Sequence, residues 1–134
     1  MYVVRPLTQD EKANPVEEKD LPRGALRTES HELFQVNADK MPIGTSAHND
    51  VPFSVSELPM ISGQTLYILS DGYEDQFGGP MGKKFLSKAM KRFLLTLQGK
   101  SMVEQRNQLD KTIEDWKGEL DQVDDILVIG LKIQ

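Results

Sequence analysis

Two aspartates stand at the ends of two strongly apolar segments of the sequence. Asp71 follows the segment Thr65–Leu69 after a single serine, and Asp124 precedes the segment 126–133. If the two segments are neighbouring antiparallel strands, the end of one lies beside the start of the other. The two carboxylates would then converge, and strand ends would hold them rigidly. We therefore interpret Asp71 and Asp124 as candidate metal ligands.

Converging carboxylates without a histidine or thiol nearby suit a hard cation, because magnesium and manganese prefer oxygen ligands. Such an ion can turn a bound water into a nucleophile and neutralise charge on a phosphoryl group. Gly72 would let another backbone or a ligand approach closely, since it has no side chain. Spacing alone leaves simpler alternatives open: an Asp-Gly pair is common in turns, and an aspartate before a strand often keeps an edge soluble. Further acids nearby are interpreted as solvated loop charges that attract cations: Glu74, Asp75, Glu119 and Asp121.

The composition excludes several kinds of chemistry. The chain has no cysteine, so disulfides, zinc–thiolate sites and thiol nucleophiles are excluded. His31 and His48 are its only histidines, and any histidine-dependent site has to use one of them. The net charge of −5 argues against a general nucleic-acid binder, since phosphate affinity comes from clustered lysine and arginine.

Length and hydropathy indicate one globular domain without a membrane span. The 134 residues are 38% hydrophobic and 28% charged, which is typical of a globular chain that buries a core. No run approaches the roughly 18 apolar residues of a membrane span. The first residues also lack the apolar region of a secretory signal. We therefore expect no membrane contact by this segment and a cytoplasmic location.

The strands are predicted from apolar content and alternation, at residues 2–5, 32–37, 51–57, 65–69 and 125–133. The segment 65–69 is apolar on both faces, which predicts a strand buried in the middle of a layered structure, and the final strand is also predicted to be well buried. Pro52 predicts that the strand 51–57 lies at an edge of the sheet or that the proline stands at a strand end, because proline cannot donate a backbone hydrogen bond. The polar stretch 8–30 is predicted to be a long, flexible loop.

Two helices are predicted before the last strand. Apolar residues follow one helical stripe over residues 83–98, and Gly99 stands at the usual glycine position after a helix. Ser101 and Glu104 form a capping-box pattern that begins the second helix, which Gly118 ends. This order of elements predicts an α+β fold in which a mainly antiparallel sheet carries the pair of helices on one face.

Three segments, taken together in this order, resemble the motifs of a known family. Residues 65–79 (TLYILSDGYEDQFGG) are similar to the late motif of metal-dependent, protein phosphatase 2C-like enzymes, in particular the bacterial branch typified by sporulation stage II protein E, SpoIIE. Residues 39–44 (DKMPIG) resemble the segment that precedes this motif, and residues 123–128 (VDDILV) resemble the closing Asp-Asp motif. The similarity runs over about residues 32–133, and residues 2–5 can be placed as the preceding strand.

The resemblance implies a sandwich of two central β-sheets flanked by helices, and hydrolysis of phosphoserine or phosphothreonine in proteins. Two manganese or magnesium ions in the complete domain would activate a water that attacks phosphorus directly. By motif match, Asp71 and Asp124 are similar to the family's metal ligands, with Gly72 and Asp125 as their supporting neighbours. No catalytic side chain beyond the metal ligands is implied. The substrate would be a phosphoprotein, such as an anti-sigma-factor antagonist, in bacterial signal transduction.

The sequence departs from the family pattern near its beginning. Neither the early aspartate that bridges both metals nor the family's Asp-x-x-Gly-His-Gly segment is found, and residues 8–30 do not match them. Residues 1–134 are therefore expected to form the C-terminal portion of a phosphatase domain that, alone, binds manganese or magnesium weakly and hydrolyses phosphate esters poorly or not at all. Apolar surface left uncovered predicts a homodimer or higher oligomer. The alternative is a non-catalytic interaction module that docks a signalling partner.

Overall fold

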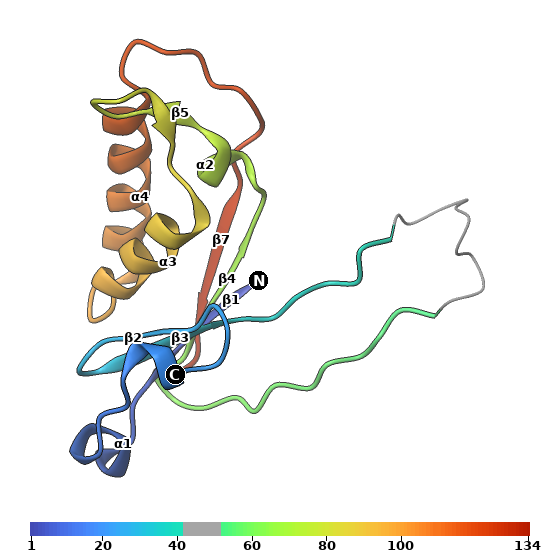
Figure 1. Cartoon of the computed structure of the whole chain (residues 1–134), viewed down its shortest axis with the longest axis vertical. Coiled ribbons are helices and arrows are strands. Elements are labelled where there is room, and N and C mark those ends of the chain that lie inside the picture. The colour runs from blue at the N-terminus through green and yellow to red at the C-terminus, as the bar shows by residue number, and fades with distance from the viewer. Residues whose placement is uncertain (42–51) are drawn as a thin grey trace.

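One antiparallel sheet organises the computed structural model, which describes residues 1–41 and 52–134 (Figure 1). The strands are β1 Tyr2–Pro6, β2 Leu26–Arg27, β3 His31–Gln35, β4 Thr65–Leu69, β5 Phe77–Gly78, β6 Lys83–Lys84 and β7 Val128–Lys132. Five of them form the sheet in the order β2-β3-β1-β4-β7, and every neighbouring pair is antiparallel. The other two, β5 and β6, form a small separate hairpin.

The two longest helices among the described residues pack against one face of this sheet. The helices are α1 Gln9–Ala13, the 3-10 turn η1 Glu18–Asp20, α2 Gly72–Asp75, α3 Ser87–Thr96 and α4 Met102–Lys117. Figure 1 shows α3 in yellow and α4 in orange on the same side of β4 and β7. The expected fold, an antiparallel sheet with a pair of helices on one face, is confirmed. Within residues 1–41 and 52–134, no helix has both the length and the apolarity needed to cross a bilayer.

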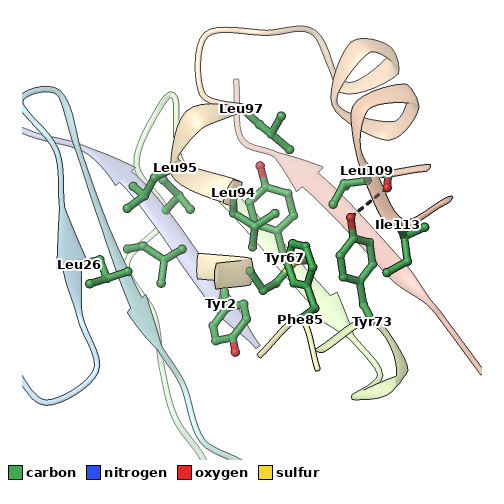
Figure 2. Packing of buried hydrophobic residues seen from close by; sticks show 13 residues of the cluster. Tyr2, Leu26, Tyr67, Tyr73, Phe85, Leu94, Leu95, Leu97, Leu109 and Ile113 are labelled. Atoms are coloured by element: carbon green, nitrogen blue, oxygen red, sulfur yellow. Dashed lines mark hydrogen bonds between the residues drawn. The ribbon is translucent and has the colours of Figure 1, made fainter. Parts of the chain in front are cut away.

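The core lies between the helices and the sheet, where buried apolar side chains of both layers meet (Figure 2). Tyr67 of β4 is fully buried at its centre. Its hydroxyl donates to Gln105 Oε1 at 2.5 Å and accepts from Gln98 Nε2 at 2.9 Å, so its polar end is satisfied by the helix layer. The Tyr73 hydroxyl likewise donates to the carbonyl of Leu109 at 2.9 Å. These bonds fix α4 over the sheet.

The ends of α4 follow the predicted sequence signals. Ser101 Oγ accepts from the backbone N–H of Glu104, whose carboxylate accepts from the backbone N–H of Ser101, so the capping box before α4 is confirmed. Gly99 and Gly118 adopt φ values of +86° and +57°, the left-handed region that glycine enters without steric cost. Gly118 directly follows α4, as predicted, whereas α3 ends at Thr96, two residues before the predicted end, and Gly99 lies in the turn beyond it.

The helix α3 begins four residues later than predicted. Lys83 and Lys84 pair with β5 as the strand β6 instead of starting the helix. Leu86, directly before α3, has φ 71° and ψ 147°, and it is the one non-glycine residue of positive φ in the described part of the chain. An L residue with a side chain cannot continue a helix from this conformation, so the helix starts at Ser87.

The second face of the sheet is not covered as the sequence predicted. Tyr67 points into the core, but Ile68, its neighbour in β4, is 53% exposed. The last strand, expected to be well buried, is an edge strand in which Ile129 and Leu131 are 50% and 55% exposed. The prediction of burial on both faces was therefore wrong for these strands. Among the described residues, the face opposite the helices carries no second layer over them.

Two further segments differ from the sequence predictions. The stretch 8–30, expected to be a loop, contains α1, η1 and β2, while its flexibility stays a prediction. The described part of the expected strand 51–57, from Pro52 onward, forms no strand. Pro52 lacks a backbone N–H, and Ser54 donates its N–H and hydroxyl to the carboxylate of Asp39 instead. Residues 42–51, which include His48 and half of the 39–44 motif, lie outside the described residues.

Candidate metal site at the ends of β4 and β7

The antiparallel pairing of β4 and β7 brings the two acidic segments to the same edge of the sheet. The register pairs Leu69 with Val128. Beyond the strands, the backbone N–H of Ser70 still donates to the carbonyl of Leu127 at 3.0 Å. The predicted arrangement, in which the end of one strand lies beside the start of the other, is thus confirmed. Asp71 and Asp124 stand on the two backbone segments that leave and enter these strands.

Ser70 ties the two segments together, and sequence reasoning missed its role. Its hydroxyl donates to the carbonyl of Asp125 at 2.7 Å and accepts from the N–H of Leu127 at 2.9 Å. One side chain therefore satisfies a donor and an acceptor of the opposite segment. The available signal was a hydroxyl residue between an apolar strand and an Asp-Gly pair, where it can reach neighbouring backbone.

Gly72 sits where no side chain fits. A Cβ atom placed on it would lie 2.4 Å from the carbonyl oxygen of Asp125 and 3.3 Å from the carbonyl carbon of Asp124. Both neighbours are backbone atoms, which cannot move aside as a flexible side chain could. The absence of a side chain at position 72 therefore lets the two acidic segments touch. The contribution of Gly72 and Asp125 to a metal site stays a prediction.

The carboxylates of the two candidate ligands are exposed to solvent. Asp71 precedes α2 and makes no side-chain capping bond, while its backbone carbonyl accepts from the N–H groups of Glu74 and Asp75 at 2.9 Å. Asp124 accepts from the N–H of Asp125 through Oδ1 at 2.7 Å, and its own carbonyl accepts from Gln122 Nε2 at 2.7 Å. Among the described residues, the second carboxylate oxygen of Asp124 accepts no hydrogen bond, and neither carboxylate oxygen of Asp71 accepts one.

Two of the acids near Asp71 are engaged elsewhere. The hydroxyl of Tyr2 donates to Glu74 Oε1 at 2.6 Å. Burial of that tyrosine, with the hydrogen bond and charge of Glu74, raises the pKa of the Tyr2 hydroxyl well above its usual range. Asp75 Oδ2 lies 3.0 Å from the ammonium of Lys84. Glu74 and Asp75 lie in α2 and have partners within the chain, so the interpretation of these two residues as loop charges was wrong.

A buried glutamine holds the loop that leads to Asp124. Gln76, which has no exposed surface, donates through Nε2 to the carbonyl of Asp121 at 3.0 Å. Its Oε1 accepts from the N–H of Val123 at 3.4 Å, and its carbonyl accepts from the indole N–H of Trp116 at 3.0 Å. Gln76 therefore connects α4, the loop before β7 and the segment after α2. Nothing in the sequence pattern distinguished this glutamine from an exposed one.

The donor chemistry of the site fits a hard divalent cation, and the set of donors is small. Asp71 and Asp124 present oxygen atoms only, and magnesium is commonly held by one or two carboxylates together with waters and substrate phosphate. Within the parts of the chain that the structure describes, no three histidine, cysteine or acidic side chains come together closely enough to hold a metal. The two carboxylates therefore fit part of a magnesium or manganese site.

Comparison with known proteins assigns the chain to a class of phosphatase domains. A solved structure, the "SiaA-PP2C domain of Pseudomonas aeruginosa", is similar with 29% sequence identity and a TM-score of 0.61. The similarity covers 63% of this chain and 35% of that chain, so this chain spans about a third of that domain. A search of curated proteins finds no match.

The family itself follows from a sequence profile. The profile described as "Stage II sporulation protein E (SpoIIE)" matches residues 20–134, which is most of the chain. The chain belongs to the SpoIIE family of protein phosphatase 2C-like domains. The resemblance seen in the motifs at residues 65–79 and 123–128 is thereby confirmed.

Proposed function

We propose that this chain contributes the late metal ligands of a protein phosphatase that hydrolyses phosphoserine or phosphothreonine in a bacterial signalling protein. Asp71 and Asp124 are the proposed ligands of magnesium or manganese, of which the complete domain would hold two ions. The observation that carries the proposal is the contact of Gly72 with the backbone of Asp124 and Asp125, which joins the two acidic segments at one sheet edge. Membership of the SpoIIE family supports the reaction class.

Each residue of the site has a part in this proposal. A bound cation would supply an activated water and neutralise charge on the phosphoryl group. Asp71 and Asp124 bind and orient it, and Ser70 keeps their backbones in register through its two hydrogen bonds. Gly72 allows the close approach, and Asp125 holds one oxygen of Asp124 through its N–H. The substrate is proposed to be a phosphoprotein such as an anti-sigma-factor antagonist.

The small donor set limits what the chain does by itself. Two carboxylates leave most positions around each cation to water, so the affinity for manganese should be low. We expect the isolated chain to turn over phosphate esters poorly or not at all, because an incompletely held ion is not positioned against the substrate.

Paramagnetic broadening of amide NMR signals by manganese tests the site independently of activity. We expect broadening confined to residues around 70–73 and 123–126, and its loss in Asp71→Asn and Asp124→Asn. The matched control is Asp115→Asn, which removes an exposed aspartate paired with Lys111 on α4. Broadening that is centred elsewhere, or that persists in both site variants, contradicts the proposed ligands. Manganese-dependent hydrolysis of p-nitrophenyl phosphate that Asp71→Asn abolishes would overturn the expected inactivity.

The open sheet face favours a second candidate function, a non-catalytic interaction module that docks a second copy of this chain. Ile68, Ile129 and Leu131 expose apolar surface side by side on β4 and β7. Antiparallel pairing of β7 with its own copy about Gly130 would set Ile129 opposite Leu131. Lys132 would face Val128, so the one charge on the strand would not meet a like charge. Such edge pairing is a common mode of association.

A further inference from the structure

A second concave site lies away from the strand ends, between the segment 18–26 and the first turn of α3. Its cavity has a volume of about 350 Å³. Four cationic side chains and one acidic side chain line it: Lys19, Arg23, Lys88, Lys91 and Glu18. The lining is thus strongly positive, although the whole chain has a net charge of −5. A positive concavity on a negative protein concentrates field and attracts anions.

Lys91 is the buried cation of this cavity. It is only 8% exposed, and its Nζ donates to the carbonyl of Gly24 at 3.0 Å and lies 5.3 Å from the centre of the Tyr2 ring. An ammonium carries three donors, and the described residues use one of them for a hydrogen bond. Burial lowers the pKa of Lys91 below its usual range. A nearby anion would favour the charged form and satisfy the remaining donors.

Packing alone does not account for a lysine at this position. The residues Met90 and Leu94 on the same helix are fully buried and apolar. Desolvating an ammonium is costly, and an apolar side chain of similar volume is often equal or better for stability in such a place. The charge of Glu74 acts against the effect of burial on the pKa of Lys91, but Glu74 accepts its hydrogen bond from Tyr2 and forms no ion pair with Lys91 among the described residues. A ligand of opposite sign would supply the partners that this buried ammonium lacks.

The other cations of the cavity are available or weakly held. Arg23 is exposed and makes no ion pair or side-chain hydrogen bond with the described residues. Lys88 lies 3.4 Å from Glu18, with both side chains 62% exposed, and such surface pairs are weak. A guanidinium offers a planar pair of donors that matches two oxygens of an anion. The lining therefore presents the guanidinium of Arg23, the exposed ammonium of Lys88 and the buried ammonium of Lys91 to one cavity.

We propose that this cavity binds a phosphate group, either as free phosphate or as the side-chain phosphate of a phosphorylated peptide. A phosphate carries up to two negative charges and three strong acceptor oxygens, which match the excess of positive charge and the free donors of Arg23 and Lys91. A carboxylate would offset less of that charge. The site is separate from Asp71 and Asp124, and the proposal stands whether or not those residues bind a metal.

An NMR titration of the chain, in a chelator and without divalent cations, tests the proposal apart from the phosphatase function. The probes are inorganic phosphate, a phosphoserine peptide and the same peptide with unmodified serine. We expect saturable shifts of amides near 19–26 and 87–91 with both phosphate-bearing probes. If the phosphopeptide binds more tightly than inorganic phosphate, the site is assigned to phosphorylated protein. If the phosphopeptide and inorganic phosphate bind equally tightly, the site is assigned to the free anion.

Variants give the decisive comparison. Arg23→Gln should weaken phosphate binding about tenfold, because it removes a charged hydrogen bond to the anion. The matched control is Arg92→Gln, an exposed arginine one residue after Lys91 that does not line the cavity, and it should leave the affinity unchanged. Lys91→Met should reduce binding further while it keeps the volume of the buried chain. If Lys91→Met fails to fold, the difference in affinity between Arg23→Gln and Arg92→Gln still decides the test.

Three results would overturn the proposal. The first is a set of shifts centred on residues 70–73 and 123–126 instead of the cavity. The second is an equal effect of Arg23→Gln and Arg92→Gln on the affinity, which would reveal only general charge attraction. The third is equal binding of the phosphorylated and unmodified peptides together with no saturable binding of inorganic phosphate.

Discussion

The two faces of the sheet are built from the same strands and end in opposite environments. Tyr67 points toward the helices and is fully buried, while Ile68, the next residue of β4, is 53% exposed on the other face. In β7 the same alternation places Gly130, the partner of Tyr67, on the helix side and places Ile129 and Leu131 on the other face. Strand alternation therefore decides which residues share a face, and a second layer decides whether that face is buried.

The open face is itself divided into two parts. Near β2 and β3, Arg5 and Arg27 bind Glu32, and Arg5 also binds Glu11 of α1 at 2.6 Å. Charges that pair with one another cover this ionic part, in which the Nε of Arg27 is a buried donor without a hydrogen-bond partner among the described residues. The part on β4 and β7 is apolar and exposed. The contrast supports the proposal that the apolar part is a contact surface, because the ionic part already has its partners within the chain.

The largest effect is expected on the covered face. Tyr67→Ala should lower the free energy of unfolding by roughly 3–5 kcal/mol, because it removes a large buried ring and leaves Gln105 without its partner. Urea unfolding followed by circular dichroism measures the change. A loss below about 1 kcal/mol would mean that this face is not packed as described.

The next effect is expected at the edge where the acidic segments meet. Gly72→Ala should cost about 1–3 kcal/mol through overpacking, since the added Cβ would clash with the carbonyl of Asp125. It should also shift the amide NMR signals of residues 123–126. The control for the signals is Gly82→Ala, where the added Cβ meets nothing within 4 Å: its φ of +58° strains an alanine and costs stability, but the signals of residues 123–126 should stay in place. Unmoved signals in Gly72→Ala would refute the close contact.

Substitutions on the exposed apolar part of β4 and β7 are expected to change stability only slightly. Their larger effect is expected on self-association. Ile68→Thr and Ile129→Thr should each change the free energy of unfolding by less than about 1 kcal/mol at low protein concentration. Ile129→Thr, on the strand proposed to pair with its own copy, should weaken self-association more than Ile68→Thr does, and light scattering measures this. Val103→Thr on α4 is the control, because it changes an apolar side chain that is more than half exposed and lies on a helix instead of the sheet. A monomer at high concentration in the unmodified chain would contradict this surface assignment.

The smallest effect is expected in the ionic part, as a pH dependence. The hydrogen bonds from Arg5 and Thr8 hold the pKa of Glu11 down to about 2. Because the folded-state pKa is depressed, this stabilisation is present above the ordinary glutamate pKa and is lost as the pH falls toward 2. Glu11→Gln should flatten this part of the acid unfolding profile relative to the exposed control Glu29→Gln. Identical profiles for the two variants would exclude Glu11 as a contributor.

The sequence predicted the elements better than their surroundings. The capping box at Ser101 and the glycine at position 118 gave both ends of α4 correctly, because those signals act within a few residues. The apolar pattern of β4 and β7 gave the strands but not the exposure of Ile68, since burial depends on a layer that local sequence does not describe. The start of α3 was misplaced because Lys83 and Lys84 pair with Phe77 and Gly78 in a short hairpin, which the helical stripe of apolar residues did not indicate.

The candidate site was predicted in part for the same reason. The sequence predicted that the segments carrying Asp71 and Asp124 lie side by side, because the two apolar strands were assumed to be antiparallel neighbours. The roles of Ser70 and Gln76 could not be predicted, because each acts on backbone groups more than forty positions away. Long-range backbone partners leave no periodic trace in the sequence. The cationic cavity was missed likewise, since its lysines and arginine come from two separate segments.

The attachment of β7 to a single neighbour has a consequence for local opening. In the part of the chain that the structure describes, β7 pairs with β4 alone, so it can detach without unravelling the remaining strands. Detachment would carry Asp124 away from Asp71 and dismantle the acidic edge. By thermodynamic linkage, any cation held between these carboxylates would slow hydrogen–deuterium exchange of the β7 amides while leaving exchange in β1 and β3 unaltered.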